Sequence, residues 1–387
     1  MNRSLLLRTA ASTLLALNAA KAGVEEAPVV ADPAGLTTTS ESFADWLWGL
    51  PILIDDPNAG FIQKLAITGR YHGQAWFVDS DQGEGSDWEN RRLWVGADMT
   101  FLKKFRVKAD VVLDAENWDP AYSNLYEAYA SYKHNDAFTF NFGRREPILT
   151  QEFHSSKTIL TLERSLLVNT LHPENIAGWW ANGSFGDGWQ YDLGLYSGTL
   201  DKELGSFDAG WVYMASLGYD FAKLAGTGKS LLRLDYLGND GDAGNNQAKP
   251  YEHSVSLNYT GEYGKFGMIT DVMFGSGLDS TSDVWGLVLM PTYNITEKLQ
   301  LVGRYQFANS EDPNGLNLQR RYERQADALP GTRGDQYQAF YAGINYYIHQ
   351  HKLKVMTGIE YSMMDDAAND GGEFDGWSGF AGLRLYF

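Results

Sequence analysis

The sequence predicts an all-β protein whose strands, about sixteen of them, close into a transmembrane antiparallel β-barrel. Three observations lead to this fold class. Apolar and polar residues alternate over many stretches of about ten residues, and the connections between these stretches are short and long in turn. After the N-terminal region, no stretch approaches the roughly 20 consecutive apolar residues that a membrane helix needs. A closed barrel can span a membrane without such a helix, because its strands satisfy one another's backbone groups.

The composition suits many strands joined by tight turns. Of the 387 residues, 14% are aromatic, 21% are charged and 41 are glycine. Aromatic residues favour strands, and glycine favours turns. The chain has no cysteine, which excludes disulfides and thiolate metal sites. No break in composition divides the chain, so we expect one large barrel and not several domains.

The first 22 residues predict a secretory signal peptide. A mostly apolar run from Leu5 to Leu17 follows a basic start, and Ala20 and Ala22 form an A-x-A cleavage pattern, so residues 1–22 would be removed from the mature chain. An uncleaved anchor is the alternative, but the apolar run is too short to span a bilayer. The signal peptide predicts an exported protein.

Residues 23–64 predict an N-terminal extension on the periplasmic side, and residues 65–387 predict the outer-membrane barrel. Within the extension, Ser42 can cap a short helix that continues to Leu50, and Pro51 would end that helix. The composition is compatible both with a plug-like flap and with a plain linker.

From residue 65 onward the alternation has a period of two. In the first stretch Leu65, Ile67 and Tyr71 share one face. Arg70 and His72 share the other face, so one face suits lipid and the other suits water. The predicted strands are residues 65–77, 91–101, 105–113, 125–133, 138–145, 176–185, 189–197, 212–220, 230–238, 253–261, 265–275, 284–293, 299–308, 336–347, 353–361 and 377–387.

The connections alternate strictly between short and long. Bacterial outer-membrane barrels have this asymmetry, with short periplasmic turns and longer outside loops. A β-propeller would show a motif repeated about every 40 to 50 residues, and none is visible. The last strand ends in Phe387 and resembles the closing strand of bacterial outer-membrane proteins. The short connections include residues 102–104, 134–137, 186–188 and 349–352, and the long ones include residues 78–90, 239–252, 309–335 and 362–376.

One long connection, from Arg144 to Ile176, differs from the others. The other long connections are rich in Asp, Asn and Gly and predict solvated loops, whereas this one is rich in apolar and basic residues. Apolar side chains such as Leu162, Leu166 and Val168 need a surface to pack against, which argues against disorder. We therefore expect this connection to fold into the lumen and to narrow the channel.

The face opposite the apolar one defines the lumen, and its charges are close to balanced. The net charge of −18 therefore resides mostly in the loops. It does not predict a cation channel, because charges at the narrowest point set selectivity, whereas loop charges in water are screened within about 8 Å. The basic wall positions are Arg70, Arg92, Arg106, Lys108, Lys133, Arg145, Arg233, Arg304, Lys354 and Arg384, and the acidic ones are Asp98, Asp110, Glu127, Asp192, Asp220, Asp235, Asp271 and Glu360.

Four residues of the inward connection could bind an oxyanion. They are Ser155, Ser156, Lys157 and Arg164. Hydroxyl, ammonium and guanidinium groups all donate hydrogen bonds, and the planar guanidinium matches the geometry of an oxyanion. The alternative is that the two basic residues form ion pairs with Glu152 and Glu163 and only fix the loop to the wall. The sequence leaves both alternatives open.

The segment FGRREPILTQEF (residues 142–153), followed by SSK (155–157) and LERS (162–165), resembles the corresponding part of the phosphate-selective porin O/P family. The resemblance extends to the sixteen-strand plan and to the terminal strand. It implies a homotrimeric outer-membrane channel for anions such as phosphate or pyrophosphate, with inward arginines and a lysine at the constriction. By this resemblance, Lys157 and Arg164 lie in the loop motif. The candidate wall residues are Arg70, Arg92, Arg106 and Arg145.

The leading hypothesis is a passive porin for small hydrophilic solutes in the outer membrane of a Gram-negative-type bacterium, in contact with lipid and without a cofactor. A sugar-selective channel is a second hypothesis, since Trp76, Trp94 and Trp180 could stack on sugar rings, although tryptophan also forms the aromatic girdles of any barrel. An enzyme is a third, because His154 and Ser155 are adjacent, but adjacency does not supply catalytic geometry. The sequence shows no metal-ligand cluster and no basic nucleic-acid patch.

Overall fold

The computed structural model describes residues 43–116, 119–199, 203–205, 207–208, 210–241, 250–327 and 331–387. The predicted signal peptide and residues 23–42 of the predicted extension lie outside the described residues. The chain divides into two units, Met1–Leu47 and Trp48–Phe387. What is described of the first unit is the start of helix α2 (Phe43–Gly49), which matches the helix that the sequence predicts before Pro51.

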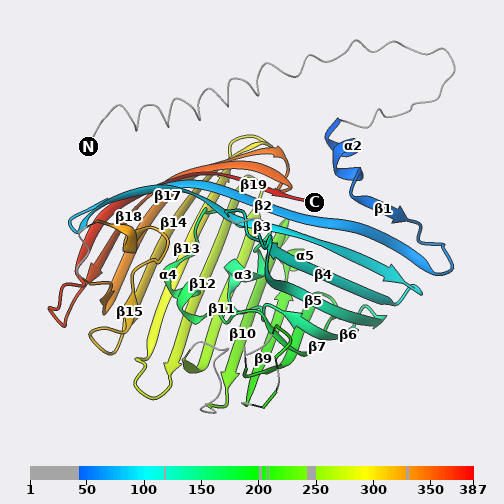
Figure 1. The fold of residues 1–387 in the computed structure, drawn as a ribbon, viewed down its shortest axis with the longest axis horizontal. Helices are drawn as coiled ribbons and strands as arrows, with labels where there is room; N and C mark the ends of the chain where they lie inside the picture. Colours follow the sequence, from blue (N-terminus) through cyan, green and yellow to red (C-terminus); the bar gives the residue numbers. More distant parts are fainter. Residues whose placement is uncertain are drawn as a thin grey trace, which may run out of the picture. The chain divides into compact units, whose positions relative to one another are not determined.

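Sixteen strands of the second unit form a closed antiparallel β-barrel, which confirms the predicted fold class (Figure 1). Each strand pairs with its neighbour along the chain, and the last strand pairs with the first, which closes the sheet. The strands are β2 (Ile62–Ser80), β3 (Gly83–Phe101), β4 (Phe105–Leu113), β5 (Tyr122–Asn135), β6 (Phe138–Arg145), β7 (Ile176–Phe185), β8 (Trp189–Ser197), β9 (Trp211–Asp220), β10 (Lys229–Asn239), β11 (Tyr251–Tyr263), β12 (Phe266–Gly277), β13 (Val284–Asn294), β14 (Leu299–Ser310), β17 (Gln336–His349), β18 (Leu353–Asp365) and β19 (Phe374–Tyr386). A further short strand, β1 (Ile52–Asp55), pairs with residues 64–66 of β2.

The alternation of apolar and polar residues locates most strands closely. β4, β6, β7 and β8 begin and end at the predicted residues. The long connection predicted over residues 78–90 is wrong, because β2 continues to Ser80 and β3 begins at Gly83, so that only Asp81 and Gln82 remain as a turn. Backbone pairing continues there beyond the apolar part of both strands, since exposed polar side chains do not prevent it.

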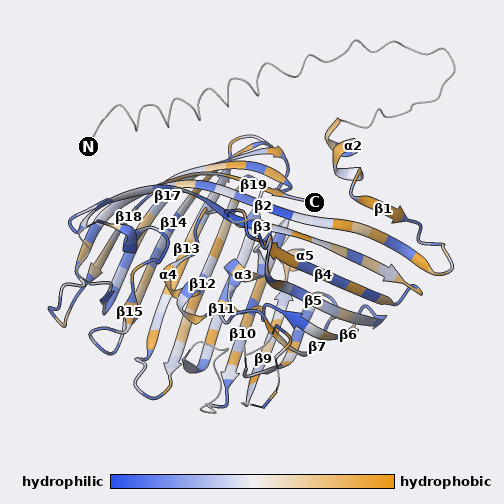
Figure 2. Cartoon of the chain, in the orientation of Figure 1, coloured by the Kyte–Doolittle hydropathy of each residue, from blue (hydrophilic) through white to orange (hydrophobic). Residues whose placement is uncertain are grey.

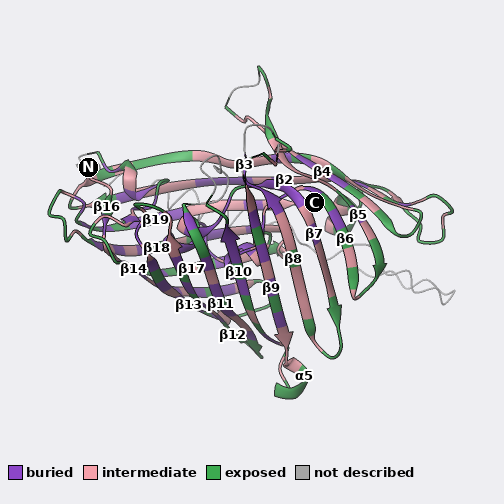
Figure 3. Cartoon of the chain, turned by 90° about the horizontal axis from the view of Figure 1, so that it is seen from below, coloured by how far each residue is buried: buried purple, intermediate pink, exposed green. Residues whose placement is uncertain are grey.

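The strands present apolar side chains outward and polar side chains to the interior of the barrel. On β12, the side chain of Val272 is 55% exposed on the outer surface, whereas the adjacent Asp271 is 2% exposed. Hydrophobic and hydrophilic bands alternate along the strands in Figure 2, and buried and exposed positions alternate in Figure 3. Such an apolar outer face suits contact with lipid. Further exposed apolar residues of the strands include Leu193, Leu217, Leu234, Leu257, Leu289, Leu301, Ile344 and Ile359.

Short and long connections follow each other in strict turn along the barrel, as the sequence predicts, apart from the first hairpin. In an antiparallel barrel this places them at opposite ends, and the asymmetry of outer-membrane barrels makes the short-turn end the periplasmic one. The short connections are residues 102–104, 136–137, 186–188, 221–228, 264–265, 295–298 and 350–352. The long ones are residues 114–121, 146–175, 198–210, 240–250, 278–283, 311–335 and 366–373.

Helices are few and short. The connections hold α3 (Gln151–His154), α4 (Leu166–Leu171), α5 (Ala222–Ala225), the 3-10 helix η1 (Glu323–Gln325) and the strand pair β15 (Leu316–Asn317) and β16 (Arg333–Gly334). In the part of the chain that the structure describes, no helix is long and apolar enough to cross a membrane. All of these elements but α5 belong to two connections, residues 146–175 and 311–335.

The outward position of Val272 in the middle of β12 gives a test of the lipid-facing surface. Val272→Lys should lower the free energy of unfolding from phospholipid vesicles by roughly 2–4 kcal/mol, because it places a charge in the hydrocarbon. Urea titration followed by tryptophan fluorescence measures this change. The control, Asp187→Lys in the exposed turn between β7 and β8, should change it by less than about 0.5 kcal/mol. Equal effects of the two substitutions would show that this face does not meet lipid.

Candidate solute pathway

Residues 146–175, termed the inward segment, fold into the barrel and are held there by polar contacts to several strands. The backbone N–H of Gln151 donates to the carboxylate of Asp271 on β12 at 2.8 Å. The ring of His154 lies 2.9 Å from the carboxylate of Asp235 on β10. These two contacts fix α3 against the wall formed by β10 to β12.

Two buried cations of the wall bind backbone carbonyls of the inward segment. Lys354 of β18 donates to the carbonyl of Ile159, and Arg384 of β19 donates to the carbonyl of Leu162 at 2.8 Å. These bonds satisfy carbonyl groups that an irregular buried backbone would otherwise leave unpaired. The apolar residues of the segment pack into the core of the barrel, where full burial of one such side chain contributes roughly 1.5–3 kcal/mol. They include Leu149, Phe153, Leu162, Leu166, Leu167, Val168 and Leu171.

Arg304 of β14 and Glu360 of β18 form a buried ion pair at 2.7 Å, with side chains 1% and 0% exposed. Arg304 also donates to the carboxylate of Glu152 at 3.3 Å and to the carbonyl of Glu163 at 2.7 Å. Charges this deeply buried are stable only when they are paired and hydrogen-bonded. Arg304, held by Glu360, therefore binds the inward segment at two points.

The loop between β14 and β17 also enters the barrel, which corrects the prediction that it is solvated. Its Tyr322 is 1% exposed and donates to Glu360 at 2.8 Å. Its Glu323 accepts hydrogen bonds from the hydroxyls of Tyr337 and Ser362, both at 2.6 Å. Burial and the nearby Glu360 raise the pKa of Glu323 to about 7. The ion pair of Arg304 and Glu360 thus lies between the two connections, because Arg304 binds the inward segment and Glu360 binds Tyr322 of the other loop.

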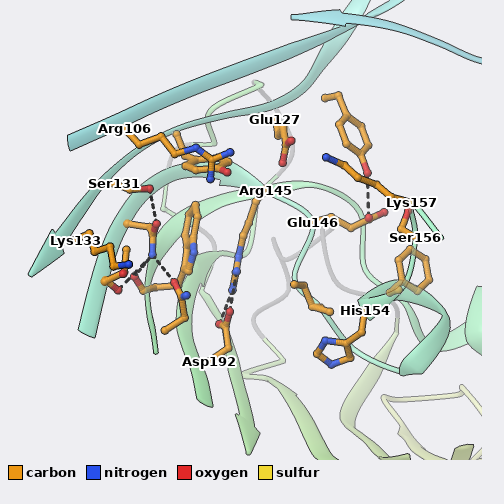
Figure 4. Close-up of a pocket in the computed structure, with 18 of the residues that line it drawn as sticks. Arg106, Glu127, Ser131, Lys133, Arg145, Glu146, His154, Ser156, Lys157 and Asp192 are labelled. Atoms are coloured by element: carbon orange, nitrogen blue, oxygen red, sulfur yellow. Dashed lines mark hydrogen bonds and ion pairs between the residues drawn. The ribbon is translucent and has the colours of Figure 1, made fainter. Parts of the chain in front are cut away.

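Several large cavities lie beside the inward segment, and two of them bear on the predicted site. The outer cavity, of about 780 Å³, opens among the long connections, and its basic residues are Arg91, Arg320, Arg321, Arg324 and Arg333. The inner cavity, of about 700 Å³, opens near the turn of residues 102–104 and is shown in Figure 4. Both are large enough for small hydrophilic solutes.

A narrow cavity of about 10 Å³ lies between the outer and inner cavities. It shares Arg91 and Glu163 with the outer cavity and Ser156 with the inner one, so the three adjoin. Its lining residues are Arg91, Arg92, Ser156, Ile159, Leu162, Glu163, Arg164 and Arg384. A space of this volume holds about one water molecule, and it is the smallest of the three adjoining cavities.

The hydroxyl of Ser156 contacts two of the predicted arginines. Arg164 donates to its hydroxyl at 3.2 Å, and Arg70 lies at 3.5 Å from the same oxygen. Arg92 lines the same narrow cavity, with a guanidinium nitrogen 3.3 Å from the ring of His72. The structure therefore brings together three of the predicted arginines, two from the wall and one from the inward segment.

The other two predicted wall arginines line the inner cavity but are already paired. Arg106 makes two hydrogen bonds to Asp98, at 2.7 and 2.6 Å. Arg145 makes two to Asp192, at 2.9 and 2.6 Å, and Figure 4 shows its guanidinium directed at that carboxylate. Bidentate pairs of this kind leave little of the positive charge available to a passing solute.

Lys157 lines the inner cavity, where Figure 4 shows it near Ser156. Burial, together with the neighbouring cations of the wall, lowers the pKa of Lys157. In the described part of the chain neither Lys157 nor Arg164 forms an ion pair, because Glu152 and Glu163 pair with arginines of the wall. Of the two sequence alternatives, the geometry thus favours basic residues that remain available over residues that only fix the loop.

Arg91 is a site residue that strict alternation misses. The register between β2 and β3 shifts after the pair His72↔Arg92, which leaves Arg91 as the extra residue of a β-bulge. Its Nε lies 3.4 Å from the carboxylate of Glu163, inside the barrel. An alternating strand would place Arg91 in lipid at a cost of roughly 2–4 kcal/mol, so the Arg-Arg doublet itself was a signal for the bulge.

Glu163 is the acidic residue that lines the narrow cavity. Burial would raise its pKa, but Arg91, Arg321, a hydrogen bond from Gln74 and Arg384 together lower the pKa to about 2. Glu163 is therefore ionised at every physiological pH, and the positive charge of the cavity is reduced by one unit.

Two of the three candidate lumenal tryptophans, Trp94 and Trp180, are covered by other side chains. The ring of Trp94 stacks with Tyr126 at a centroid distance of 3.7 Å, and the guanidinium of Arg70 lies 4.5 Å from the same ring. The guanidinium of Arg145 lies 4.3 Å from the ring of Trp180. A sugar-stacking platform needs an open ring face. These two tryptophans already use their faces within the protein.

The adjacent His154 and Ser155 do not point at each other. The ring of His154 faces Asp235, and the hydroxyl of Ser155 donates to the carbonyl of Gln151 at 3.1 Å. A nucleophile and its base must lie within hydrogen-bond distance, so these residues do not form a catalytic pair. Among the residues that the structure describes, no group of three or more His, Asp or Glu side chains could hold a metal ion.

A closed barrel of sixteen strands with polar cavities inside defines a channel of the porin type. The chain belongs to the family whose model is described as "Putative beta-barrel porin-2, OmpL-like", which matches residues 89–381. No curated protein matches the sequence. The family and the fold place the protein in the outer membrane of a Gram-negative-type bacterium.

Solved porin structures share the fold at low sequence identity. The outer membrane channel DcaP of Acinetobacter baumannii is 12% identical, with a TM-score of 0.55 over 85% of this chain and 98% of that one. An anion-selective porin from Comamonas acidovorans is 10% identical, with a TM-score of 0.59 over 84% and 99%. OmpF of Salmonella typhi is 13% identical, with a TM-score of 0.59 over 84% and 98%. The comparisons support a bacterial porin, and they do not support the phosphate-selective O/P family in particular.

Removing the positive member of the buried ion pair tests its role as an anchor. Arg304→Met should lower the free energy of unfolding by roughly 3–5 kcal/mol, because it leaves Glu360 and Glu152 without their counter-charge. It should also expose the bond after Lys157 to trypsin. Arg233→Met is the control, since Arg233 is only half-buried and binds the neutral Gln190. If Arg304→Met and the control give the same free energy of unfolding and the same trypsin cleavage, the ion pair does not hold the inward segment.

The raised pKa of Glu323 makes the docking of its loop dependent on pH. The docked state holds the proton more tightly than a free carboxyl of pKa 4.5, so docking is strongest below about pH 4.5 and weakens until about pH 7. Between these two pH values the free energy of docking of the loop should fall by on the order of 3 kcal/mol. Hydrogen exchange of residues 316–327, corrected for intrinsic rates, should therefore show less protection at pH 8 than at pH 5. Glu323→Gln should remove this difference in protection. Glu311 is an exposed residue of the same loop, so Glu311→Gln should retain the difference.

Proposed function

We propose that the protein is a passive diffusion channel that favours small anions over cations. The proposal rests on the lining of the narrow cavity, which contains four arginines and one glutamate. Fixed charges at the narrowest point determine selectivity, because they act at close range and with little water between them and the ion. The net charge of −18 has the opposite sign, but it resides mostly in the loops, where salt screens it.

The cavities on both sides of the narrow point support the same proposal. The outer cavity contributes Arg320, Arg324 and Arg333, so an anion arriving from outside meets positive charge before it reaches the narrow point. On the inner side, Arg70 and Lys157 line the cavity that follows. An anion would thus find basic side chains along the whole route.

Phosphate and pyrophosphate are the candidate solutes that the O/P resemblance suggests. The inner cavity is large enough for either, but the narrow cavity is not, so side chains of the inward segment would have to move during passage. Inorganic anions the size of chloride fit with less movement. The proposal includes a homotrimer, which also follows from that resemblance, and the mass of the detergent-solubilised protein measured by light scattering tests it.

Reversal potentials across a KCl gradient in a planar bilayer test the proposed selectivity. The wild-type channel should be anion-selective, and Lys157→Ala and Arg164→Ala should each lower the ratio of chloride to potassium permeability by several-fold, because each removes one charge from the route. Lys298→Ala, in an exposed turn outside the route, is the control and should leave the ratio unchanged.

Addition of phosphate separates a general anion channel from a phosphate-binding one. Block of the chloride current by phosphate, weakened in the Lys157 and Arg164 variants, would support phosphate as a solute. Anion selectivity without block would leave a channel for small anions. Cation selectivity in the wild type would overturn the proposal.

A further inference from the structure

The narrow cavity contains more positive charge than its carboxylates balance. Arg91, Arg92, Arg164 and Arg384, termed the arginine cluster, line it together with Glu163. Glu163 pairs with Arg91 at 3.4 Å, and among the described residues the other three arginines form no ion pair. Buried charges without a counter-charge cost several kcal/mol each. The cluster therefore needs a further negative charge.

The two nearest additional carboxylates are already engaged elsewhere. Glu89 pairs with Arg321 at 2.5 Å, on the side of the outer cavity. Glu146 accepts a hydrogen bond from the hydroxyl of Tyr126 at 3.0 Å, and burial raises its pKa, which weakens it as a counter-charge. Neither residue lines the narrow cavity.

Two arginines of the cluster have buried N–H groups without an acceptor. These are Nε of Arg164, and Nε and Nη1 of Arg384, whereas Nε of Arg91 faces the carboxylate of Glu163 at 3.4 Å. The Nη2 donors of both residues are used, since Nη2 of Arg384 binds Gln74 at 2.6 Å and Nη2 of Arg164 binds Ser156 at 3.2 Å. A buried donor without a partner costs roughly 1–3 kcal/mol. One anion that accepts from both arginines would remove several of these costs together.

The size of the cavity limits what such an anion can be. About 10 Å³ of space accommodates one particle the size of a water molecule, and a monatomic anion is only slightly larger. A tetrahedral oxyanion such as phosphate would have to displace the surrounding side chains. The charge, the free donors and the volume together select a halide.

We propose that the arginine cluster binds one halide ion, chloride under natural conditions, as a resident counter-ion of the fold. The ion would tie the inward segment, through Arg164, to β3 through Arg91 and to β19 through Arg384. The structural role of the ion goes beyond the proposed transport function, because a bound halide stabilises the barrel interior whether or not the channel selects anions.

Thermal unfolding of the purified full-length protein in detergent tests the halide site. At equal ionic strength, sodium chloride and sodium bromide should raise the unfolding midpoint by several degrees over sodium gluconate, in a saturable way, and sodium phosphate should behave like gluconate. Arg384→Gln should lose the halide-dependent shift, because it removes one charge and two of the free donors. Arg233→Gln, on the wall but outside the cluster, should retain the shift.

A crystal structure grown in sodium bromide provides a second measurement that does not depend on any variant. An anomalous peak within hydrogen-bond distance of Arg164 and Arg384 in the wild-type protein would support the site. Absence of a peak, a peak without any halide-dependent stabilisation, or equal stabilisation by phosphate would each overturn the proposal. Halide binding in a channel that proves cation-selective would uphold the site and overturn only the transport proposal, so the two failures are distinguishable.

Discussion

The interior of this barrel depends on the buried ion pair between Arg304 and Glu360. Both side chains lie on strands of a closed sheet, so their positions are fixed by the pairing of the strands. Neither charge is stable alone in such a place, and each binds a connection that would otherwise extend into water. Arg304 holds the inward segment through Glu152 and the carbonyl of Glu163, and Glu360 holds the other loop through Tyr322. One ion pair between two strands thereby contacts both of the connections that fold into the barrel.

The acidic and basic residues of the lumen are distributed unequally, although their numbers nearly balance. Acidic residues such as Asp235, Asp271 and Glu360 are used as anchors for the inward-folded connections. The arginines of β3 and β19 have fewer partners, and they meet Arg164 on the far side of the same segment. These carboxylates are thus used in contacts that hold the connections in place. Part of the positive charge of the arginines remains without a counter-charge at the narrow cavity. For this reason neither the net charge nor the wall composition indicates the electrostatics of the solute pathway.

Much of the fold follows from patterns that are local in the chain. The period-two alternation predicted both ends of β4, β6, β7 and β8 at the observed residues. The reason is that each strand of a lipid-facing barrel must present apolar side chains at every second position. The same rule fails at Arg91, where a bulge breaks the period, and in the loop between β14 and β17. That loop is polar enough to be solvated, but Tyr322 and Glu323 find buried partners that lie on other strands. A local sequence pattern cannot predict hydrogen bonds to residues that lie far along the chain.

The sequence by itself predicted an outer-membrane barrel and the position of most of its strands, and it predicted the inward course of residues 146–175 but not that of residues 311–335. These properties depend on the spacing of apolar residues, which acts over a few neighbours. Only the tertiary structure decided which charges neutralise one another, for example that Glu152 pairs with Arg304 and not with Lys157, and that Arg91 joins Arg92, Arg164 and Arg384. The physical reason is that ion pairing depends on distances of a few ångströms between residues far apart in the chain, and closure of the barrel sets those distances.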